Sequence, residues 1–176
     1  MQLTEAMQQF ILHWGEMGTR WGVNRSVAQI HALLHLSPKA LPADEIAETL
    51  GLARSNVSNG IKELQSWKLI RVSRELGDRR DHFKAEEDMI QVVRLVVEGR
   101  RSREFQPTIA AVADARDQAK ADGKTPAEIT KRMDETLRVM EMFDKWYAEM
   151  AKLPHGTQMA LLKIGAGIAR FLPKGS

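Results

Sequence analysis

Residues 43–67 read ADEIAETLGLARSNVSNGIKELQSW, and this stretch decides the fold. It places Ala47, Gly51 and Val57 at relative positions 0, +4 and +10. In a helix-turn-helix a small residue lets the two helices cross closely, a glycine takes the left-handed turn, and an apolar residue fills the crossing. The spacing therefore predicts two short helices joined at Gly51.

A basic hairpin follows the second of these helices. The runs Lys68–Arg74 and Arg80–Ala85 are strand-like and are joined around Gly77-Asp78, a favourable hairpin turn. No other segment is expected to be β. A helix-turn-helix followed by a hairpin is the order of a winged helix. The predicted fold is mainly α, a winged helix-turn-helix with one β-hairpin wing, plus N-terminal and C-terminal dimerisation helices.

Helical periodicity extends on both sides of this domain. Within residues 3–21 the apolar side chains recur in alternating steps of four and three, which predicts a helix with one apolar face. Asn24 is placed to cap the next helix. Further on, Thr125 is expected to cap a long helix from Pro126 to Leu153. A last helix is expected over Thr157–Leu172.

Composition excludes several classes of protein. The chain has 176 residues, of which 43% are hydrophobic and 28% charged, and it has no cysteine. A globular chain is expected, whereas disulfide scaffolds, thiolate metal sites and thiol nucleophiles are excluded. The N-terminal residues do not resemble a signal peptide, and no apolar run is long enough to span a membrane. We therefore expect a cytoplasmic protein.

The positive charge is unevenly placed. The net charge is only +3, but residues 51–103 hold 12 basic and 8 acidic side chains. A locally basic segment suggests a surface that faces phosphates, although an ordinary solvated face has the same pattern.

The second helix of the motif carries the side chains that could contact DNA. With Val57 facing the core, the polar residues around Asn59 point away from it and can reach base edges or phosphates. The predicted contacts on this helix are Arg54, Ser55, Asn56, Ser58, Asn59 and Lys62. An alternative is a polar face that only meets solvent.

The hairpin turn supplies two arginines. Arg79 and Arg80 are placed to enter a minor groove, where negative potential is concentrated. The alternative is that Asp78 and Asp81 neutralise them locally.

The long C-terminal helix exceeds the needs of a small domain, so we expect it to pair with a second copy of the chain. Its stripe supplies the predicted dimerisation residues Met133, Met140, Phe143 and Met150. The alternative is a helix that packs into the core of its own chain.

Four motifs resemble those of a known family: Trp21-Gly22, the helix start Leu-Pro-Ala-Asp-Glu-Ile-Ala-Glu, the Ser-Asn-Val-Ser helix and the Gly-Asp-Arg-Arg turn. Together they resemble the GbsR group of transcriptional regulators, distant relatives of the MarR winged-helix family. The resemblance covers roughly residues 10–105. It implies a bacterial dimeric repressor or activator, associated with the nucleoid, whose first and last helices form the dimer interface. Some members resemble choline-responsive repressors.

Three parts are expected on this basis: a dimerisation helix over 1–22, the DNA-binding domain over 23–104, and a helical dimerisation and effector region over 105–176. The predicted function is a homodimeric transcription regulator, a repressor, that binds double-stranded DNA at an inverted-repeat operator. The alternative is a winged-helix module that contacts proteins and has lost DNA binding.

Aromatic side chains suggest an effector site. Trp14, Trp21, Trp146 and Tyr147 could form a cage for a quaternary ammonium ion, since aromatic faces attract such cations. The alternative is that they are packing residues of the core.

Enzyme signatures are weak. His31 and His35 have the i,i+4 spacing of metal ligands, but the sequence offers no third ligand. No nucleophile elbow and no phosphate-binding loop are found. We therefore expect no catalysis, no cofactor and no metal.

Overall fold

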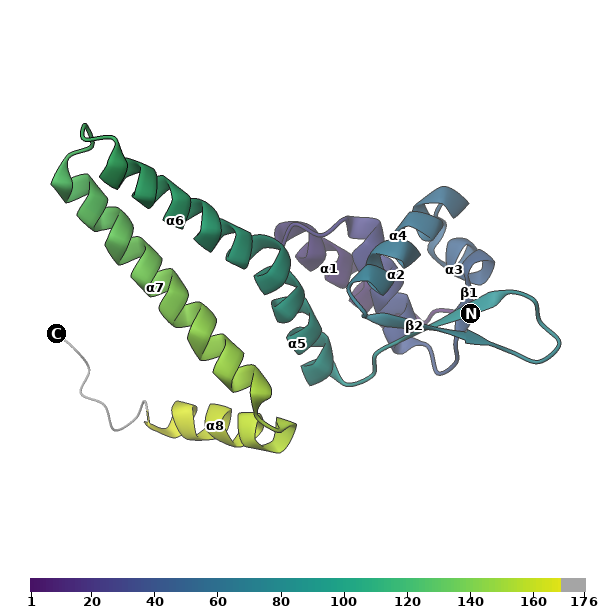
Figure 1. The fold of residues 1–176 in the computed structure, drawn as a ribbon. Helices are drawn as coiled ribbons and strands as arrows, with labels where there is room; N and C mark the ends of the chain where they lie inside the picture. Colours follow the sequence, from purple (N-terminus) through teal and green to yellow (C-terminus); the bar gives the residue numbers. More distant parts are fainter. Residues whose placement is uncertain (169–176) are drawn as a thin grey trace. The chain divides into compact units, whose positions relative to one another are not determined.

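A computed structural model describes the backbone of residues 1–168, which fall into two compact units (Figure 1). The first unit comprises Met1–Gly99, and the second begins at Arg100. No helix among these described residues is long and apolar enough to cross a bilayer.

The first unit holds five helices and three strands. In chain order they are α1 (Glu5–Arg20), α2 (Arg25–Leu36), β1 (Leu41–Pro42), α3 (Ala43–Leu50), α4 (Arg54–Ser66), β2 (Ile70–Arg74), β3 (Asp81–Ala85) and α5 (Met89–Arg100). The Asn24 side chain accepts a hydrogen bond from the Ser26 N–H, so the predicted cap of α2 is confirmed.

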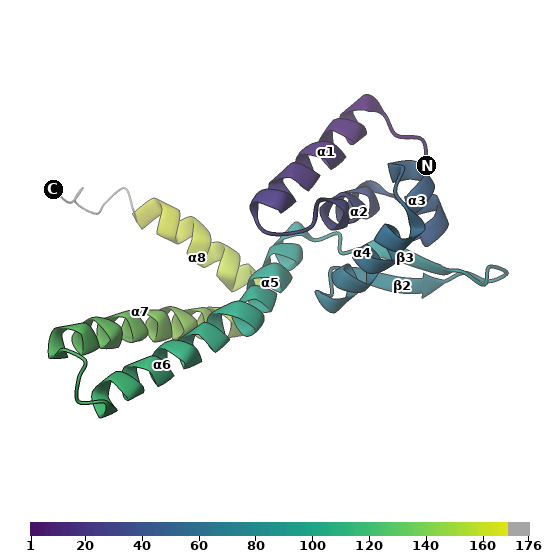
Figure 2. The ribbon, with the colours of Figure 1, turned by 90° about the horizontal axis from the view of Figure 1, so that it is seen from above.

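The sheet has three strands rather than the expected two. Strand β3 lies between β1 and β2, and both neighbours are antiparallel to it. Leu41 and Pro42 pair with Phe83 and His82. Sequence periodicity missed β1 because two residues are too few to show an alternation. Its pairing fixes the start of α3 to the wing, which Figure 2 shows extending away from the helices of this unit.

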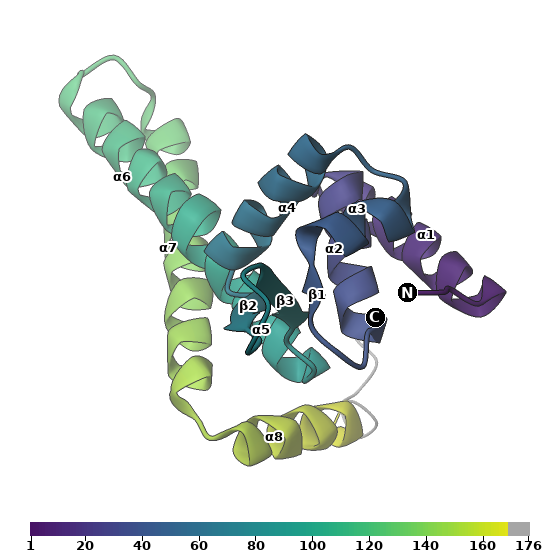
Figure 3. The same cartoon turned by 90° about the vertical axis from the view of Figure 1, so that its right-hand side faces the viewer.

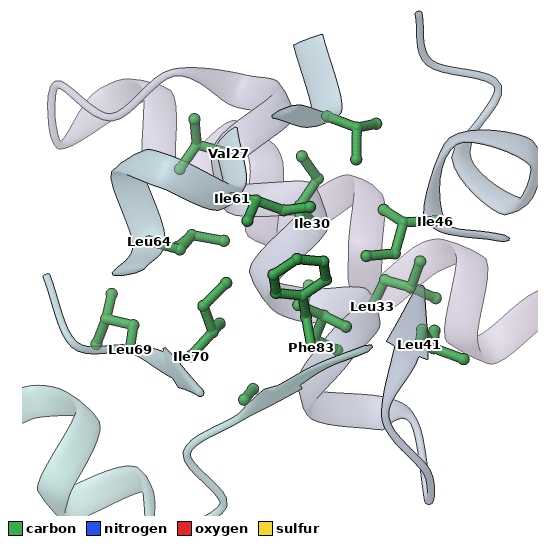
Figure 4. Packing of buried hydrophobic residues seen from close by; sticks show 14 of the residues in the cluster. Val27, Ile30, Leu33, Leu41, Ile46, Ile61, Leu64, Leu69, Ile70 and Phe83 are labelled. Carbon is green, nitrogen blue, oxygen red and sulfur yellow. The ribbon is translucent and has the colours of Figure 1, made fainter. Parts of the chain in front are cut away.

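The apolar core lies between α2, α3, α4 and the sheet. Its fully buried members include Ile30, Leu33, Ile46 and Val57. In Figure 4 the ring of Phe83, from β3, occupies the middle of this group. One core therefore holds the two helices of the motif and the wing together.

The predicted roles of the motif residues are confirmed. Ala47 is buried on α3, Gly51 has a φ of 63° and a left-handed backbone, and Val57 is fully buried on α4. After Gly51 the Leu52 N–H donates to the Ala47 carbonyl at 3.0 Å, which closes the helix end. The turn therefore needs glycine, and the crossing needs the small alanine.

The second unit is helical over its described residues. It contains the π-helical turn η1 (Arg101–Phe105), α6 (Gln106–Ala121), α7 (Ala127–Lys152) and α8 (His155–Ile168). The predicted end of the last helix at Leu172 lies outside the described residues, and α8 starts two residues earlier than expected.

The predicted cap of α7 is wrong. Helix α7 begins at Ala127 with Pro126 as its N-cap, and Thr125 makes no capping bond to the helix. Instead the Asp122 carboxylate accepts hydrogen bonds from the Lys124 N–H, the Thr125 N–H and the Thr125 hydroxyl. The aspartate organises the loop because three nearby donors converge on it.

Helix α7 has two different sides. On one side Asp134 accepts from Lys120 of α6 at 2.9 Å, Asp144 accepts from Arg101 of η1 at 2.7 Å, and Leu137 is buried. The other side exposes apolar side chains at steps of three and four: Val139, Met142, Phe143 and Trp146. Helix α7 thus packs on α6 and leaves an apolar face uncovered.

Two histidines lie at the junction of α1 and α2. His31 is buried, its ring centroid lies 6.2 Å from that of Trp14, and it stacks at 6.3 Å on His35. Buried His31 Nε2 and His35 Nδ1 have no hydrogen-bond partner among the described residues. No cluster of three or more metal-ligating side chains is found in this described part of the chain.

The burial of His31 predicts a loss of stability in acid. Burial, assisted by His35, lowers the pKa of His31 from 6.5 to about 4. The unfolded chain therefore takes up a proton below about pH 6.5 that the folded chain refuses until about pH 4. We expect the free energy of unfolding to fall through this window by about 3 kcal/mol on account of His31, at ~1.4 kcal/mol per pKa unit.

Urea unfolding at several pH values measures this loss. The His31→Leu variant should lose most of the pH dependence between about pH 6.5 and about pH 4, whereas His13→Leu, on the exposed side of α1, should keep it. Equal pH dependence in His31→Leu and the wild type would contradict the assignment.

Candidate nucleic-acid interface

Helix α4 separates an apolar face from a polar face. Val57, Ile61 and Leu64 are buried in the core. The six predicted contact residues are all exposed: Arg54, Ser55, Asn56, Ser58, Asn59 and Lys62. From residue 54 to residue 62 the helix has no carboxylate. This face is therefore polar and basic, as contact with nucleic acid requires.

Gly60 explains how closely α4 approaches its neighbour. A Cβ on Gly60 would lie 2.6 Å from Ile30 Cδ1 of α2. Any larger residue would push α4 away from α2. The glycine thus sets the depth at which α4 sits, while Asn59 beside it stays exposed.

The start of α2 adds a part of this surface that the sequence does not predict. Asn24 and Ser26, at the start of α2, line a shallow polar hollow together with Asn56, Asn59 and Glu63 of α4. The start of α2 therefore borders the recognition face. Capping identified Asn24 as a helix start, but only the packing of α2 on α4 brings it beside Asn59.

The two wing arginines have different surroundings. The guanidinium of Arg80 donates to Asp78 Oδ2 at 2.6 Å and to Asp44 Oδ2, on α3, at 2.8 Å. Asp81 pairs with Arg74 at 3.2 Å rather than with Arg80. Arg79 is exposed and has no ion-pair partner among the described residues. Local neutralisation thus occurs at Arg80, where Asp78 and Asp44 are the partners and Asp81 is not.

The hydrogen bonds of Arg80 change the titration of its partners. They lower the pKa of Asp78 to about 2 and lower the pKa of Asp44 below its ordinary value. Both carboxylates are therefore ionised at neutral pH. For Arg80 to enter a minor groove it must exchange these carboxylates for groups of the DNA.

A hollow connects the wing to the start of α4. It is lined by Arg54 of α4, Asp44 of α3 and the wing residues Arg80, Asp81 and Phe83. Figure 3 shows α3, α4 and β1 on this side of the first unit. Basic side chains from the helix and from the wing thus border one concave surface.

The predicted dimerisation residues differ in exposure. Met133, Met140 and Met150 are half-buried, whereas Phe143 is 56% exposed. Of the four, only Phe143 is among the exposed large apolar side chains of α7.

The predicted aromatic cage residues are distributed over both units. Trp14 is half-buried on α1, where it stacks on Phe10 and packs against the core. Trp21 is exposed at the end of the same helix. Tyr147 of α7 has the Arg101 guanidinium 5.6 Å from its ring centroid, and Trp146 is 60% exposed. Trp14 is therefore a packing residue, and Tyr147 already faces a cation.

Residues 21–81 match the model of the MarR family. The same part of the chain contains the two motif helices and most of the wing. This part of the chain is therefore similar to the MarR family.

A curated relative is similar over the same part of the chain. The HTH-type transcriptional repressor GbsR of Bacillus subtilis is 25% identical over 95 residues, which cover 54% of this chain and 52% of the relative. The chain thus spans about half the length of the relative that it matches.

One of two solved structures that resemble this chain shares its fold. A transcriptional regulator is 19% identical, with a TM-score of 0.57 over 83% of this chain and 95% of that chain. A MepR–DNA complex of Staphylococcus aureus is 16% identical, with a TM-score of 0.38 over 80% of this chain and 98% of the other. The first of these likenesses confirms the predicted winged helix-turn-helix.

Proposed function

We propose that the protein is a homodimeric transcription regulator, a repressor, that binds double-stranded DNA through α4 and the wing. The observation that carries the proposal is the exposed face of α4, which is free of carboxylates from residue 54 to residue 62. The match of residues 21–81 to the MarR family supports the same use of this face. A polar face that met only solvent would have no reason to lack negatively charged side chains.

Each part of the interface has a distinct role in the proposal. Asn59, Ser55 and Lys62 contact base edges or adjacent phosphates in a major groove, because their side chains are exposed on the outer face of α4. Arg79 contacts the backbone or the minor groove beside it. The bacterial nucleoid is the proposed location.

A dimer places two copies of α4 in successive major grooves. The operator should then be an inverted repeat whose half-site centres lie about 10 bp apart or a multiple of that spacing. Selection of binding sites from a random duplex library, followed by footprinting of the recovered sequence, measures this arrangement. Recovery of no preferred sequence would favour a module that contacts proteins, and a recovered site without a dyad would contradict the dimer.

The uncovered side of α7 is the surface that we assign to the dimer. Val139, Met142, Phe143 and Trp146 lie exposed on it, although large apolar groups on one side of a helix are normally covered. The opposite side, with Leu137, already packs on α6. The proposal thus keeps Phe143 of the predicted dimerisation residues and adds the exposed Val139, Met142 and Trp146.

Phe143→Glu should therefore dissociate the dimer. An unpaired carboxylate at the interface is expected to cost about 3–5 kcal/mol of assembly. Sedimentation velocity measures the oligomeric state and circular dichroism confirms folding. Gln118→Glu adds the same charge to the exposed side of α6 and should leave the dimer intact. A folded Phe143→Glu chain that remains dimeric would contradict the assignment.

We further propose that the protein binds a small-molecule effector, a quaternary ammonium ion. Trp146 is the most suitable of the four aromatic residues, because its ring is exposed and apolar neighbours surround it on α7. Tyr147 is less suitable, since Arg101 already lies over its ring.

A further inference from the structure

The end of the recognition helix rests on a glycine of α5. A Cβ built on Gly99 would lie 2.4 Å from Cζ3 and 2.5 Å from Cε3 of Trp67. Non-bonded carbons normally stay about 3.5 Å apart or more. The six-membered ring of Trp67 therefore lies directly on the backbone of α5, and no residue with a side chain can take the place of Gly99 without moving it.

Gly99 continues the face by which α5 packs on the core of the first unit. Val92 is buried, and Leu95 and Val96 pack against the same core cluster. Gly99 follows at the next helical step, and it is the last residue of this unit. Glycine is unfavourable within a helix, so its presence here needs a compensating contact. The packing of the Trp67 ring on the α5 backbone at Gly99 supplies that contact.

Trp67 also lies at the joint between the recognition helix and the wing. It is the C-cap of α4, and Lys68 after it has a φ of 59°, unusual for a residue other than glycine. The Leu69 N–H then donates to the Leu64 carbonyl at 3.0 Å. Strand β2 starts at Ile70. A shift of the Trp67 ring would thus move the end of α4 and the start of the wing together.

We propose that the Trp67–Gly99 contact positions the recognition helix and passes a displacement of α5 to it. The inference rests on the proposed DNA-binding function and names the regulation of that same site. Trp67 is a positioning residue, because it acts through α4 and β2 rather than by touching DNA. Two residues after Gly99 the chain enters the π-helical turn η1, a type of turn that is frequent at functional sites. A change in helix geometry at that turn reaches α4 through Gly99.

The test compares specific and non-specific binding of the full chain. The specific probe is the duplex that the wild type selects from a random library, and the other probe is a random duplex of equal length. Gly99→Ala should weaken binding to the selected duplex by about tenfold or more, because α4 no longer fits the bases. Binding to the random duplex should change by no more than about twofold, because phosphate contacts tolerate such a shift. General destabilisation would not separate the two probes.

Two further variants complete a double-mutant cycle. Trp67→Leu removes the ring and should also reduce selectivity. Gly99→Ala combined with Trp67→Leu should bind like Trp67→Leu alone, since leucine leaves room for the added Cβ. Gly156→Ala is the matched control, because a Cβ there meets nothing within 4 Å.

Several outcomes would overturn the inference. They are wild-type selectivity in Gly99→Ala, equal losses on both duplexes, and additive effects in the cycle. If Gly99→Ala fails to fold, the Trp67→Leu variant is the deciding test, because it adds no volume to the core. Unchanged selectivity in Trp67→Leu would then overturn the proposal. A wild type that selects no duplex would instead remove the proposed function, and this inference with it.

Discussion

The packing of α4 against α2 determines where the DNA-facing side of the recognition helix lies. At Gly60 the absent side chain leaves the space that Ile30 fills, and at Val57 the crossing with α3 is closed by a fully buried side chain. These contacts fix both the depth and the rotation of α4. They therefore also fix the direction in which the side chains between Val57 and Gly60 point. Asn59 is exposed as a consequence of what its neighbours bury.

Charge is arranged around this fixed helix so that few groups compete with DNA. The two aspartates of the wing form ion pairs within the protein: Asp78 binds Arg80, and Asp81 binds Arg74. Arg80 also binds Asp44 of α3, which ties the wing to the start of that helix, while Arg79 stays exposed. Since exposed ion pairs contribute little stability, their main effect is on the orientation of the wing.

The sequence predicts the motif well because its constraints are local. The helix-turn-helix requires a small residue, a left-handed glycine and an apolar residue at the crossing. The spacing of Ala47, Gly51 and Val57 shows that the sequence meets these three requirements. Strand β1 and the hydrogen bonds of the Asp122 carboxylate escape prediction, because two residues show no period and the three converging donors leave no periodic pattern. The ion pair of Arg80 with Asp44 and the contact of Trp67 with Gly99 also escape it. Both join residues more than 30 positions apart in the chain, which only the folded core brings together.

The most direct test of the account is the binding of Asn59→Ala and Arg79→Ala to the selected duplex and to its single-base variants at two salt concentrations. Fluorescence anisotropy gives each affinity, with Arg132→Ala on α7 as a control for lost charge. Asn59→Ala is predicted to lose about 1–3 kcal/mol of discrimination between the duplexes. Arg79→Ala is predicted to bind every duplex more weakly and to lower the salt slope by about one unit. Equal losses on all duplexes with the same salt dependence in both variants would contradict the account.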